Sequence, residues 1–209
     1  MNINREKVKG FLKETFETVI FVIVMVIAIR YFVGEIRWIP SASMKPTLIE
    51  GDRVFVERFS RFYKTPGRGD IMVFYPPDEN LYFDFWSVFR RLTGFACKDV
   101  AYIKRVVGLP GDKLELKKIA DYSYEVYING KPLKEPYIKS ESDYIPCMQN
   151  MYCGPFVIPE DNYFMMGDNR GNSQDSRFWG FLPKERFIGK ATMLFWPLNR
   201  IHYFEKQNY

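Results

Sequence analysis

The sequence has a single histidine, His202, among its 209 residues. A Ser-His-Asp triad can draw its members from any part of a chain, so this scarcity does not exclude such a site, but it leaves one candidate. His202 lies close to the C-terminus with no aspartate near it, and a partly exposed structural side chain in an edge strand or tail is the simpler interpretation. A serine nucleophile would therefore need another base, for which lysine is a known alternative.

Cysteine is also scarce. Three cysteines without spaced CxxC pairs, and far from the lone histidine, do not form a zinc-site pattern, and the sequence implies no metal and no cofactor. Cys147 and Cys153 share one loop-like stretch and can close a small disulfide if the domain lies outside the cytoplasm, which would leave Cys97 over. Two separate thiols remain an equal alternative, because spacing alone does not fix disulfide geometry.

The charge pattern argues against nucleic-acid binding. The formal net charge is +5, but Lys and Arg are scattered among Asp and Glu without a basic stripe. Long amphipathic helical patterns are also missing after residue 35, whereas Phe, Tyr, Gly and Pro are frequent, which favours short strands and turns. The length allows one domain plus an anchor.

One long apolar run lies near the N-terminus. It begins at Thr18 and reaches Gly34 with Arg30 as its only charge, although it is uninterrupted for just 11 residues, 19–29. Counted through Arg30, whose stem can snorkel, it reaches the lower limit of a spanning helix. A basic flank precedes it and no small-x-small cleavage site follows, which predicts an uncleaved signal anchor. We therefore expect a cytoplasmic tail at 1–17, a transmembrane anchor at 18–34 and an extracytoplasmic domain at 35–209; a hydrophobic helix docked on a soluble domain is the alternative.

The remaining chain is typical of a mainly β, antiparallel β-sheet domain. Short runs rich in Val, Ile and aromatic residues alternate with turns that contain Gly and Pro, and Asn129-Gly130 predicts a tight turn. The expected strands are 53–59, 70–75, 100–107, 114–116, 122–128, 163–166 and 188–196.

Residues 80–99 interrupt this pattern. Aromatic side chains such as Phe85, Trp86 and Phe89 crowd together there, with Arg90 and Arg91 close behind. Such a mixture suits a membrane interface, with rings at headgroup level and arginines on the phosphates. A lid packed on the β domain is an equal alternative.

Two serines follow the apolar run within the short segment 40–46. Prolines at both of its ends restrict the backbone around Ser41 and Ser43, as a hydroxyl presented from a fixed position requires. Serine beside proline also marks ordinary turns, so this segment alone does not identify a nucleophile.

Lys104 is the candidate base. In a strand it points to the face opposite Arg105 and shares its own face with Tyr102 and Val106, where desolvation lowers a lysine pKa. A pKa near 8 requires roughly 3 kcal/mol of destabilisation of the ammonium, and the neutral amine is then a competent base. An exposed Lys-Arg pair is the alternative, since lysines are seldom fully buried.

A third segment, 166–180, carries Asp168, Arg170, Asp175 and Arg177. These charges can form bidentate pairs that stiffen a loop. A calcium site is disfavoured, because the arginines would repel the cation and the acid spacing is not that of an EF-hand.

These segments together resemble bacterial type I signal peptidase, the leader peptidase family. The likeness extends from the anchor to about Trp196, and several long motifs in a fixed order make it specific. The motifs are Pro40-Ser41-Ala42-Ser43-Met44-Lys45-Pro46-Thr47, Gly51-Asp52, Arg68-Gly69-Asp70-Ile71, Tyr102-Ile103-Lys104-Arg105-Val106-Val107-Gly108-Leu109-Pro110-Gly111-Asp112, Gly167-Asp168-Asn169-Arg170 and Trp179-Gly180-Phe181.

The resemblance implies a Ser-Lys dyad, with Ser43 as nucleophile and Lys104 as general base. The backbone N–H of Ser43 and the side chain of Ser41 correspond to the oxyanion hole. Ser43 also lies nine residues beyond Gly34, so an extended tether keeps it within about 30 Å of the bilayer face.

The resemblance also assigns supporting residues. Ser173 matches the serine that hydrogen-bonds and orients the lysine, and Asp175 with Arg177 matches the pair that braces the site. Gly171 replaces an acidic residue often found in this loop, which changes the expected charge pairing there but leaves the dyad intact.

The implied activity is that of a membrane-bound serine endopeptidase that cleaves exported preproteins after small residues, typically Ala-x-Ala. Its partners are then preproteins and the lipid bilayer of the inner membrane, crossed once; no oligomeric state is predicted. One alternative is a specialised Ser-Lys processing peptidase of the conjugation-pilus type. A self-cleaving Ser-Lys repressor is disfavoured by the anchor and by the lack of a DNA-binding helix pair. A non-enzymatic β domain that binds partners in the envelope is the last alternative.

Overall fold

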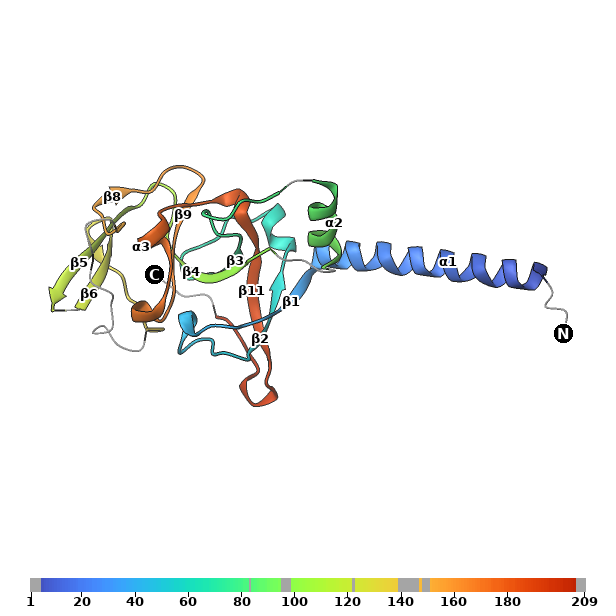
Figure 1. Cartoon of the computed structure of the whole chain (residues 1–209). Helices are drawn as coiled ribbons and strands as arrows, with labels where there is room; N and C mark the ends of the chain where they lie inside the picture. Colours follow the sequence, from blue (N-terminus) through green and yellow to red (C-terminus); the bar gives the residue numbers. More distant parts are fainter. Residues whose placement is uncertain are drawn as a thin grey trace.

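The computed structural model describes residues 5–82, 84–94, 99–121, 123–138, 147 and 151–205. A long helix, α1 (Arg5–Ala28), continues through a π-helical turn, η1 (Ile29–Val33), and projects away from a β body (Figure 1). Within the described residues one helix, Lys7–Val33, is long and apolar enough to cross a membrane, and none of its most apolar stretch is buried. In the described structure this helix is not docked on the body, and it also takes in most of the predicted tail.

The body is mainly antiparallel β-sheet, as the sequence predicts, and it is divided into two sheets. The larger sheet has the order β1-β2-β11-β3-β4-β9-β10, with β12 paired to β11, and the smaller has the order β7-β6-β5-β8. The strands of the larger sheet are β1 (Gly34–Trp38), β2 (Arg53–Glu57), β3 (Ile71–Phe74), β4 (Tyr102–Gly108), β9 (Asn162–Met166), β10 (Leu182–Pro183), β11 (Phe187–Trp196) and β12 (His202–Tyr203). The strands of the smaller sheet are β5 (Lys113–Ala120), β6 (Ser123–Ile128), β7 (Lys131–Pro132) and β8 (Phe156–Val157).

Every predicted strand has a counterpart, although Tyr122 lies outside the described residues. β5 is longer than expected and extends to Ala120, while β1 and the two-residue strands are additions. The turn after β6 is tight as predicted, because Asn129 and Gly130 both have positive φ, 51° and 81°.

The core of the larger sheet holds the serine-bearing segment in place. Ile39, Met44 and Leu48 are at most 2% exposed and pack in one cluster with Val73 of β3 and Ile103 of β4. The segment between β1 and β2, which contains the short turn η2 (Ala42–Met44), is thereby fixed beside β4.

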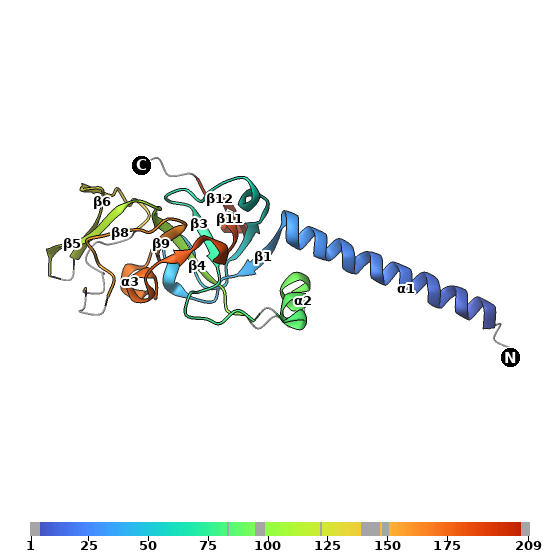
Figure 2. The same cartoon turned by 90° about the horizontal axis from the view of Figure 1, so that it is seen from above.

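Short helices complete the body. The segment 80–99 contains α2 (Phe85–Thr93), which lies beside the body end of α1 (Figures 1 and 2). The Asp84 side chain caps its first turn by accepting a hydrogen bond from Ser87 N at 3.0 Å, and Gly94 ends it in the left-handed conformation. The other short helices of the body are η3 (Phe59–Phe62), η5 (Arg170–Asn172), α3 (Ser176–Trp179), η6 (Lys184–Arg186) and η7 (Leu198–Arg200).

The structure also decides between the two cysteine alternatives. Cys147 and Cys153 form a disulfide with a Cα–Cα distance of 6.2 Å. Cys97 lies outside the described residues.

Candidate active site

Ser43 is held in the turn η2 by the loop that follows β9. Its carbonyl accepts a hydrogen bond from Asn169 N at 3.1 Å, and the Asn169 side chain donates to the carbonyl of Ala42 at the same distance. Met44, fully buried, anchors the next position in the core. The hydroxyl of Ser43 is thus presented from a backbone that is fixed on both sides.

Lys104 lies on β4 with its amine directed at that hydroxyl. The Nζ–Oγ distance is 2.7 Å, and Nζ also donates to the Ile103 carbonyl at 3.1 Å. The residue is only 5% exposed. Burial lowers the pKa of Lys104 from 10.5 to about 8, and Arg177 adds to this, whereas the carboxylates of Asp175 and Asp168 oppose it.

The neighbour of Lys104 is buried as well, so the exposed Lys-Arg pair is wrong. Arg105 points to the opposite face and binds Asp168 through two hydrogen bonds of 2.8 and 2.6 Å, and its guanidinium lies 3.9 Å from the ring centre of Tyr137. Thr47 donates to the same Asp168 carboxylate at 2.5 Å, which ties the serine-bearing segment to β4. A buried arginine is tolerated here because its charge is matched.

Asp175 and Arg177 form the predicted pair. Both are 0% exposed, and the guanidinium binds the carboxylate at 2.8 and 2.9 Å. Asp175 also accepts a hydrogen bond from Gly167 N at 3.0 Å. Burial by itself raises the pKa of Asp175, but Arg177 and these hydrogen bonds outweigh it, so the carboxyl pKa lies below its usual value.

Ser41 and Ser173 differ in how they meet their predicted roles. Ser41 Oγ lies 3.3 Å from Ser43 Oγ, next to the dyad as expected. Ser173 is buried nearby. Among the described residues its hydroxyl does not form the expected hydrogen bond to Lys104; it acts instead on the neighbouring Asp175, where it helps to lower the pKa of the carboxyl. The Ser173 hydroxyl lies close against Gly167, because a Cβ added to Gly167 would lie 2.2 Å from Ser173 Oγ.

Besides the link between Arg105 and Asp168, sequence reasoning missed a second pair in this region. Arg170 is 1% exposed and forms a bidentate ion pair with Glu135, a residue outside the loop. In the sequence, the sign of this ion pair is Glu135 itself, an acidic residue in the turn-like stretch Glu135-Pro136-Tyr137.

The other candidates of the sequence lie elsewhere. His202 is exposed on β12, and its Nδ1 lies 2.8 Å from the Arg200 carbonyl. Among the residues that the structure describes, no group of three or more His, Cys, Asp or Glu side chains is arranged to hold a metal ion. The site therefore consists of a buried lysine amine in hydrogen-bond contact with a fixed serine hydroxyl, an arrangement suited to acyl transfer.

Comparisons with known proteins point to one family. The family model described as signal peptidase, peptidase S26, matches residues 12–196. The chain is 40% identical to a signal peptidase I from Leptolyngbya laminosa, over 95% of this chain and 86% of that protein. It is 39% identical to a probable signal peptidase I-2 from Synechocystis sp., over 88% and 73%, and 34% identical to a signal peptidase I from Bacillus licheniformis, over 92% and 93%. A crystal structure of a signal peptidase I from Enterococcus faecalis covers 62% of this chain and 98% of that one, with 27% identity and a TM-score of 0.42.

Proposed function

The chain belongs to the signal peptidase family, peptidase S26, and we propose that it cleaves signal peptides from exported preproteins with Ser43 as nucleophile and Lys104 as general base. The observation that carries this proposal is the 2.7 Å contact between Lys104 Nζ and Ser43 Oγ in a buried setting. The cleavage site follows small residues, typically Ala-x-Ala, as in the family.

The proposed reaction is an acyl transfer in two halves. Neutral Lys104 Nζ takes the proton of Ser43 Oγ while this oxygen attacks the scissile carbonyl carbon, and the carbonyl electron pair moves onto its oxygen. The Ser43 N–H and the hydroxyl of Ser41 stabilise that oxyanion. Collapse breaks the C–N bond, and Lys104 returns the proton to the leaving amine, the new N-terminus of the mature protein. Water, deprotonated by Lys104, then attacks the acyl ester carbon; the ester C–O bond breaks, Lys104 returns the proton to Ser43 Oγ, and the signal peptide leaves with its new C-terminal carboxyl group.

The supporting residues have positioning roles in this proposal. Asp175 and Arg177 brace the loop whose Gly167 lies against the Ser43 carbonyl, and they set the charge around Lys104. Ser173 fills the space beside Gly167. The hydrogen bond to Lys104 that the family pattern implies for Ser173 would then form only when substrate is bound.

The membrane is part of the proposed function. α1 serves as the single-pass anchor in the cell membrane, with residues 1–17 in the cytoplasm and the body on the extracytoplasmic side. Its exposed apolar surface supports this, as do Lys7, Lys9 and Lys13 ahead of the apolar run. A preprotein whose signal still lies in the bilayer would present its cleavage site on the same side as Ser43.

Cleavage of several unrelated preproteins by the purified full chain in detergent tests the assignment. Ser43→Ala and Lys104→Ala are each expected to abolish cleavage without lowering the melting temperature by more than a few degrees, whereas Ser60→Ala and Lys131→Ala, away from the dyad, should cleave normally. Near-normal turnover by either dyad variant would refute the mechanism. Cleavage of a single substrate type would favour the specialised processing peptidase, and no cleavage by the unmodified protein would favour the non-enzymatic envelope domain.

A further inference from the structure

A single buried carboxylate lies where the long helix joins the body. Glu35, the second residue of β1, is 5% exposed. One of its oxygens binds Arg30 of η1 at 2.5 Å, and the other binds Arg37 of β1 at 2.5 Å and Arg58, which follows β2 directly, at 3.0 Å. The helix end, β1 and the end of β2 thus share one acid. We call Glu35 and its three arginines the junction cluster.

Burial distinguishes the junction cluster from an ion pair on the surface. The side chains of Glu35 and Arg58 are only 2% and 7% exposed, and those of Arg30 and Arg37 are 27% and 30% exposed. Exposed ion pairs contribute little to stability, whereas a buried charge that loses its partner is costly. Because Glu35 and Arg58 are shielded from water, the cluster resists opening.

The backbone is also held at this junction. η1 ends at Val33 and β1 begins at Gly34, which pairs with Glu57 at the end of β2. The Val33 carbonyl accepts a hydrogen bond from Arg58 N at 3.0 Å. Gly34 lies close against β2, because an added Cβ would be 2.3 Å from the Val56 carbonyl oxygen. The chain therefore passes from helix to sheet with both residues of the junction fixed on β2.

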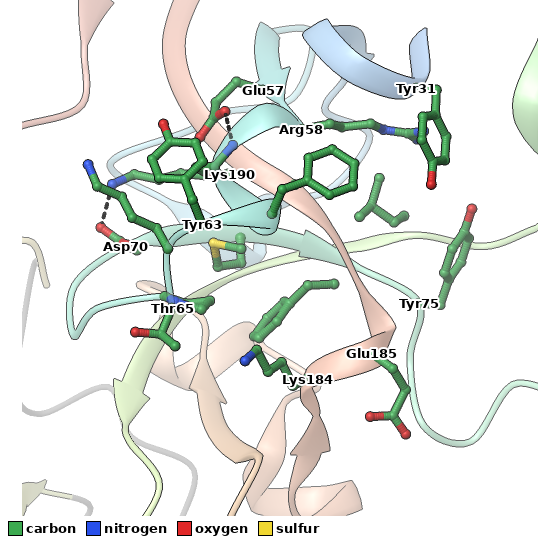
Figure 3. A pocket seen from close by; sticks show the side chains of 18 of the residues that line it. Tyr31, Glu57, Arg58, Tyr63, Thr65, Asp70, Tyr75, Lys184, Glu185 and Lys190 are labelled. Atoms are coloured by element: carbon green, nitrogen blue, oxygen red, sulfur yellow. Dashed lines mark hydrogen bonds and ion pairs between the residues drawn. The ribbon is translucent and has the colours of Figure 1, made fainter. Parts of the chain in front are cut away.

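The π-helical turn η1 is the place where the helix would otherwise bend, since sharp kinks occur at such turns. Arg30 lies in this turn and Glu35 lies just beyond it, so their ion pair bridges the turn. Arg58 reaches the same turn from the other side: in Figure 3 its side chain extends from the end of β2 toward Tyr31, another residue of η1. The junction cluster therefore braces the point at which bending is easiest.

α2 supports the same turn and is not a lid closed on the β domain. The guanidinium of Arg30 lies against Gly94, where α2 ends, because a Cβ added to Gly94 would be 2.5 Å from an Arg30 nitrogen. Both views place α2 beside this end of α1 (Figures 1 and 2). No described residue of α2 is buried, and a pocket of about 1050 Å³, lined in part by Val88 and Leu92, lies between α2 and the sheet (Figure 3). A closed lid would have filled this space, because native interiors leave few voids larger than a water molecule.

The junction is rigidly connected to the nucleophile. Ser43 follows Glu35 by eight positions in the sequence. Between them β1 continues directly into Ile39, which is 2% exposed in the core and donates its N–H to the Asp52 carbonyl at 2.9 Å. The direction of α1 relative to the body is therefore also its direction relative to the Ser43 hydroxyl.

We propose that Glu35 is a positioning residue for cleavage: it fixes the angle between α1 and the body, and this angle sets how Ser43 meets a substrate held in the same bilayer. The inference rests on the proposed function, in which α1 is the anchor and Ser43 the nucleophile. A substrate whose signal lies in the membrane approaches from one direction, and its scissile carbonyl must reach Ser43 in a defined orientation. A soluble peptide approaches from any direction, so the angle is immaterial to its cleavage.

Two matched variants, Arg30→Gln and Arg37→Gln, test the fixed angle. Both arginines bind Glu35 at 2.5 Å and are similarly exposed, but only Arg30 belongs to the helix side of the junction. Arg30→Gln leaves Glu35 with two partners, Arg37 and Arg58, so the body keeps its own ion pairs.

Pulsed electron paramagnetic resonance measures the angle without any activity assay. Spin labels are placed at two exposed positions, Val22→Cys on α1 and Glu160→Cys on the body, in the full chain with Cys97→Ser in detergent. We expect Arg30→Gln to widen the distribution of label distances about twofold through hinge motion at η1, and Arg37→Gln to leave it narrow. Equal widths in the two variants would overturn the proposal.

Cleavage of two substrates tests the consequence of the fixed angle. Misorientation should cost Arg30→Gln about tenfold in kcat/KM on a preprotein embedded in vesicles, with no loss on a short soluble peptide in detergent. Glu35→Gln should show the same difference between the substrates, whereas Arg37→Gln should cleave both normally. Arg30→Lys keeps the charge that pairs with Glu35, and we expect it to restore both the narrow distance distribution and cleavage of the embedded preprotein.

Normal cleavage of the embedded preprotein by Arg30→Gln would contradict the positioning role, because the angle would then not affect the reaction. Loss by Arg30→Gln on both substrates would also contradict it, because that result indicates damage to the body. If the unmodified chain cleaves neither substrate, the peptidase assignment fails, while the label distances still decide whether the junction cluster fixes the angle.

Discussion

At the scale of single residues, the protonation of Lys104 depends on a balance between burial and charge. Burial destabilises the ammonium, whereas the carboxylates of Asp175 and Asp168 stabilise it, and burial prevails, so that the pKa falls to about 8. A pKa near the working pH suits a general base, since a neutral fraction is present and the amine remains basic enough to take a proton.

The rate should therefore rise with pH in a defined window. Because the pKa of Lys104 is lowered to about 8, the active neutral amine makes up about one tenth of the population at pH 7 and about nine tenths at pH 9. We expect kcat/KM to increase roughly tenfold over that interval and to level off above it. The measurement is initial-rate cleavage of a peptide without ionisable side chains, and a flat profile between pH 6 and pH 9 would count against a lysine base.

The residues of the site differ in how far the sequence predicts them. The contact of Ser43 with Lys104 and the pairing of Asp175 with Arg177 were expected from motifs, and the structure contains both. The link from Arg105 to Asp168 was not expected. These two residues are 63 positions apart, and which acid meets a buried arginine is decided by the register of β4 against β9 rather than by local pattern.

At the scale of elements, the loop after β9 sets the distance between nucleophile and base. Gly167 follows β9 directly and lies between the backbone of Ser43 and the side chain of Ser173. A Cβ added to Gly167 would lie 2.4 Å from the Ser43 carbonyl oxygen and 2.2 Å from Ser173 Oγ. A side chain could rotate away, but the carbonyl belongs to η2 and moves only with the whole turn.

Gly167→Ala should consequently disable the enzyme. The turn η2 must shift to accept the methyl group, and a displacement of about 1 Å between reacting groups costs on the order of 100-fold in rate. Gly67→Ala is the matched control, because its nearest neighbour would be an ordinary 3.8 Å away. The measurement is kcat on a soluble peptide together with the melting temperature.

The double variant Gly167→Ala/Ser173→Ala sharpens this test. Removing the Ser173 hydroxyl relieves only one of three close contacts, because the Ser43 carbonyl oxygen at 2.4 Å and Ser173 Cβ at 2.6 Å remain, so activity should stay low. Recovery of activity in the double variant, or normal turnover by Gly167→Ala alone, would show that the Ser43 carbonyl does not constrain this position.

Elements were predicted best where their pattern is local. β3 and β9 are apolar runs with clear turn signals at their ends, and both appear within one or two residues of the expected bounds. β1 was missed because Gly34–Trp38 follows the apolar run without a break, and its exposed Ile36 and Trp38 give no alternating burial pattern. α2 was missed because it is short and its aromatic residues lie on the outside. In the sequence such residues indicate a binding surface more readily than a helix.

At the scale of the whole molecule, the proposed anchor and the β body form one arrangement whose orientation relative to the membrane matters. The body can act on exported proteins only if it lies outside the cytoplasm. The basic N-terminal flank favours that orientation, since Lys and Arg residues near an apolar segment tend to remain in the cytoplasm. The structure offers an internal reporter of the compartment, the disulfide between Cys147 and Cys153.

The oxidation state of this disulfide in living cells should reveal the orientation. Disulfides persist outside the cytoplasm, whereas cytoplasmic thiols are kept reduced, so a body on the extracytoplasmic side predicts that both cysteines resist alkylation. Cells that express the full chain with Cys97→Ser are acid-quenched, denatured and treated with a maleimide that adds mass. We expect no shift without a reductant and two added masses after reduction.

Cys147→Ser in the same background is the control, because it frees Cys153 and should add one mass without reductant. Two added masses before reduction would place the body in the cytoplasm, and there the anchored peptidase could not meet its exported substrates.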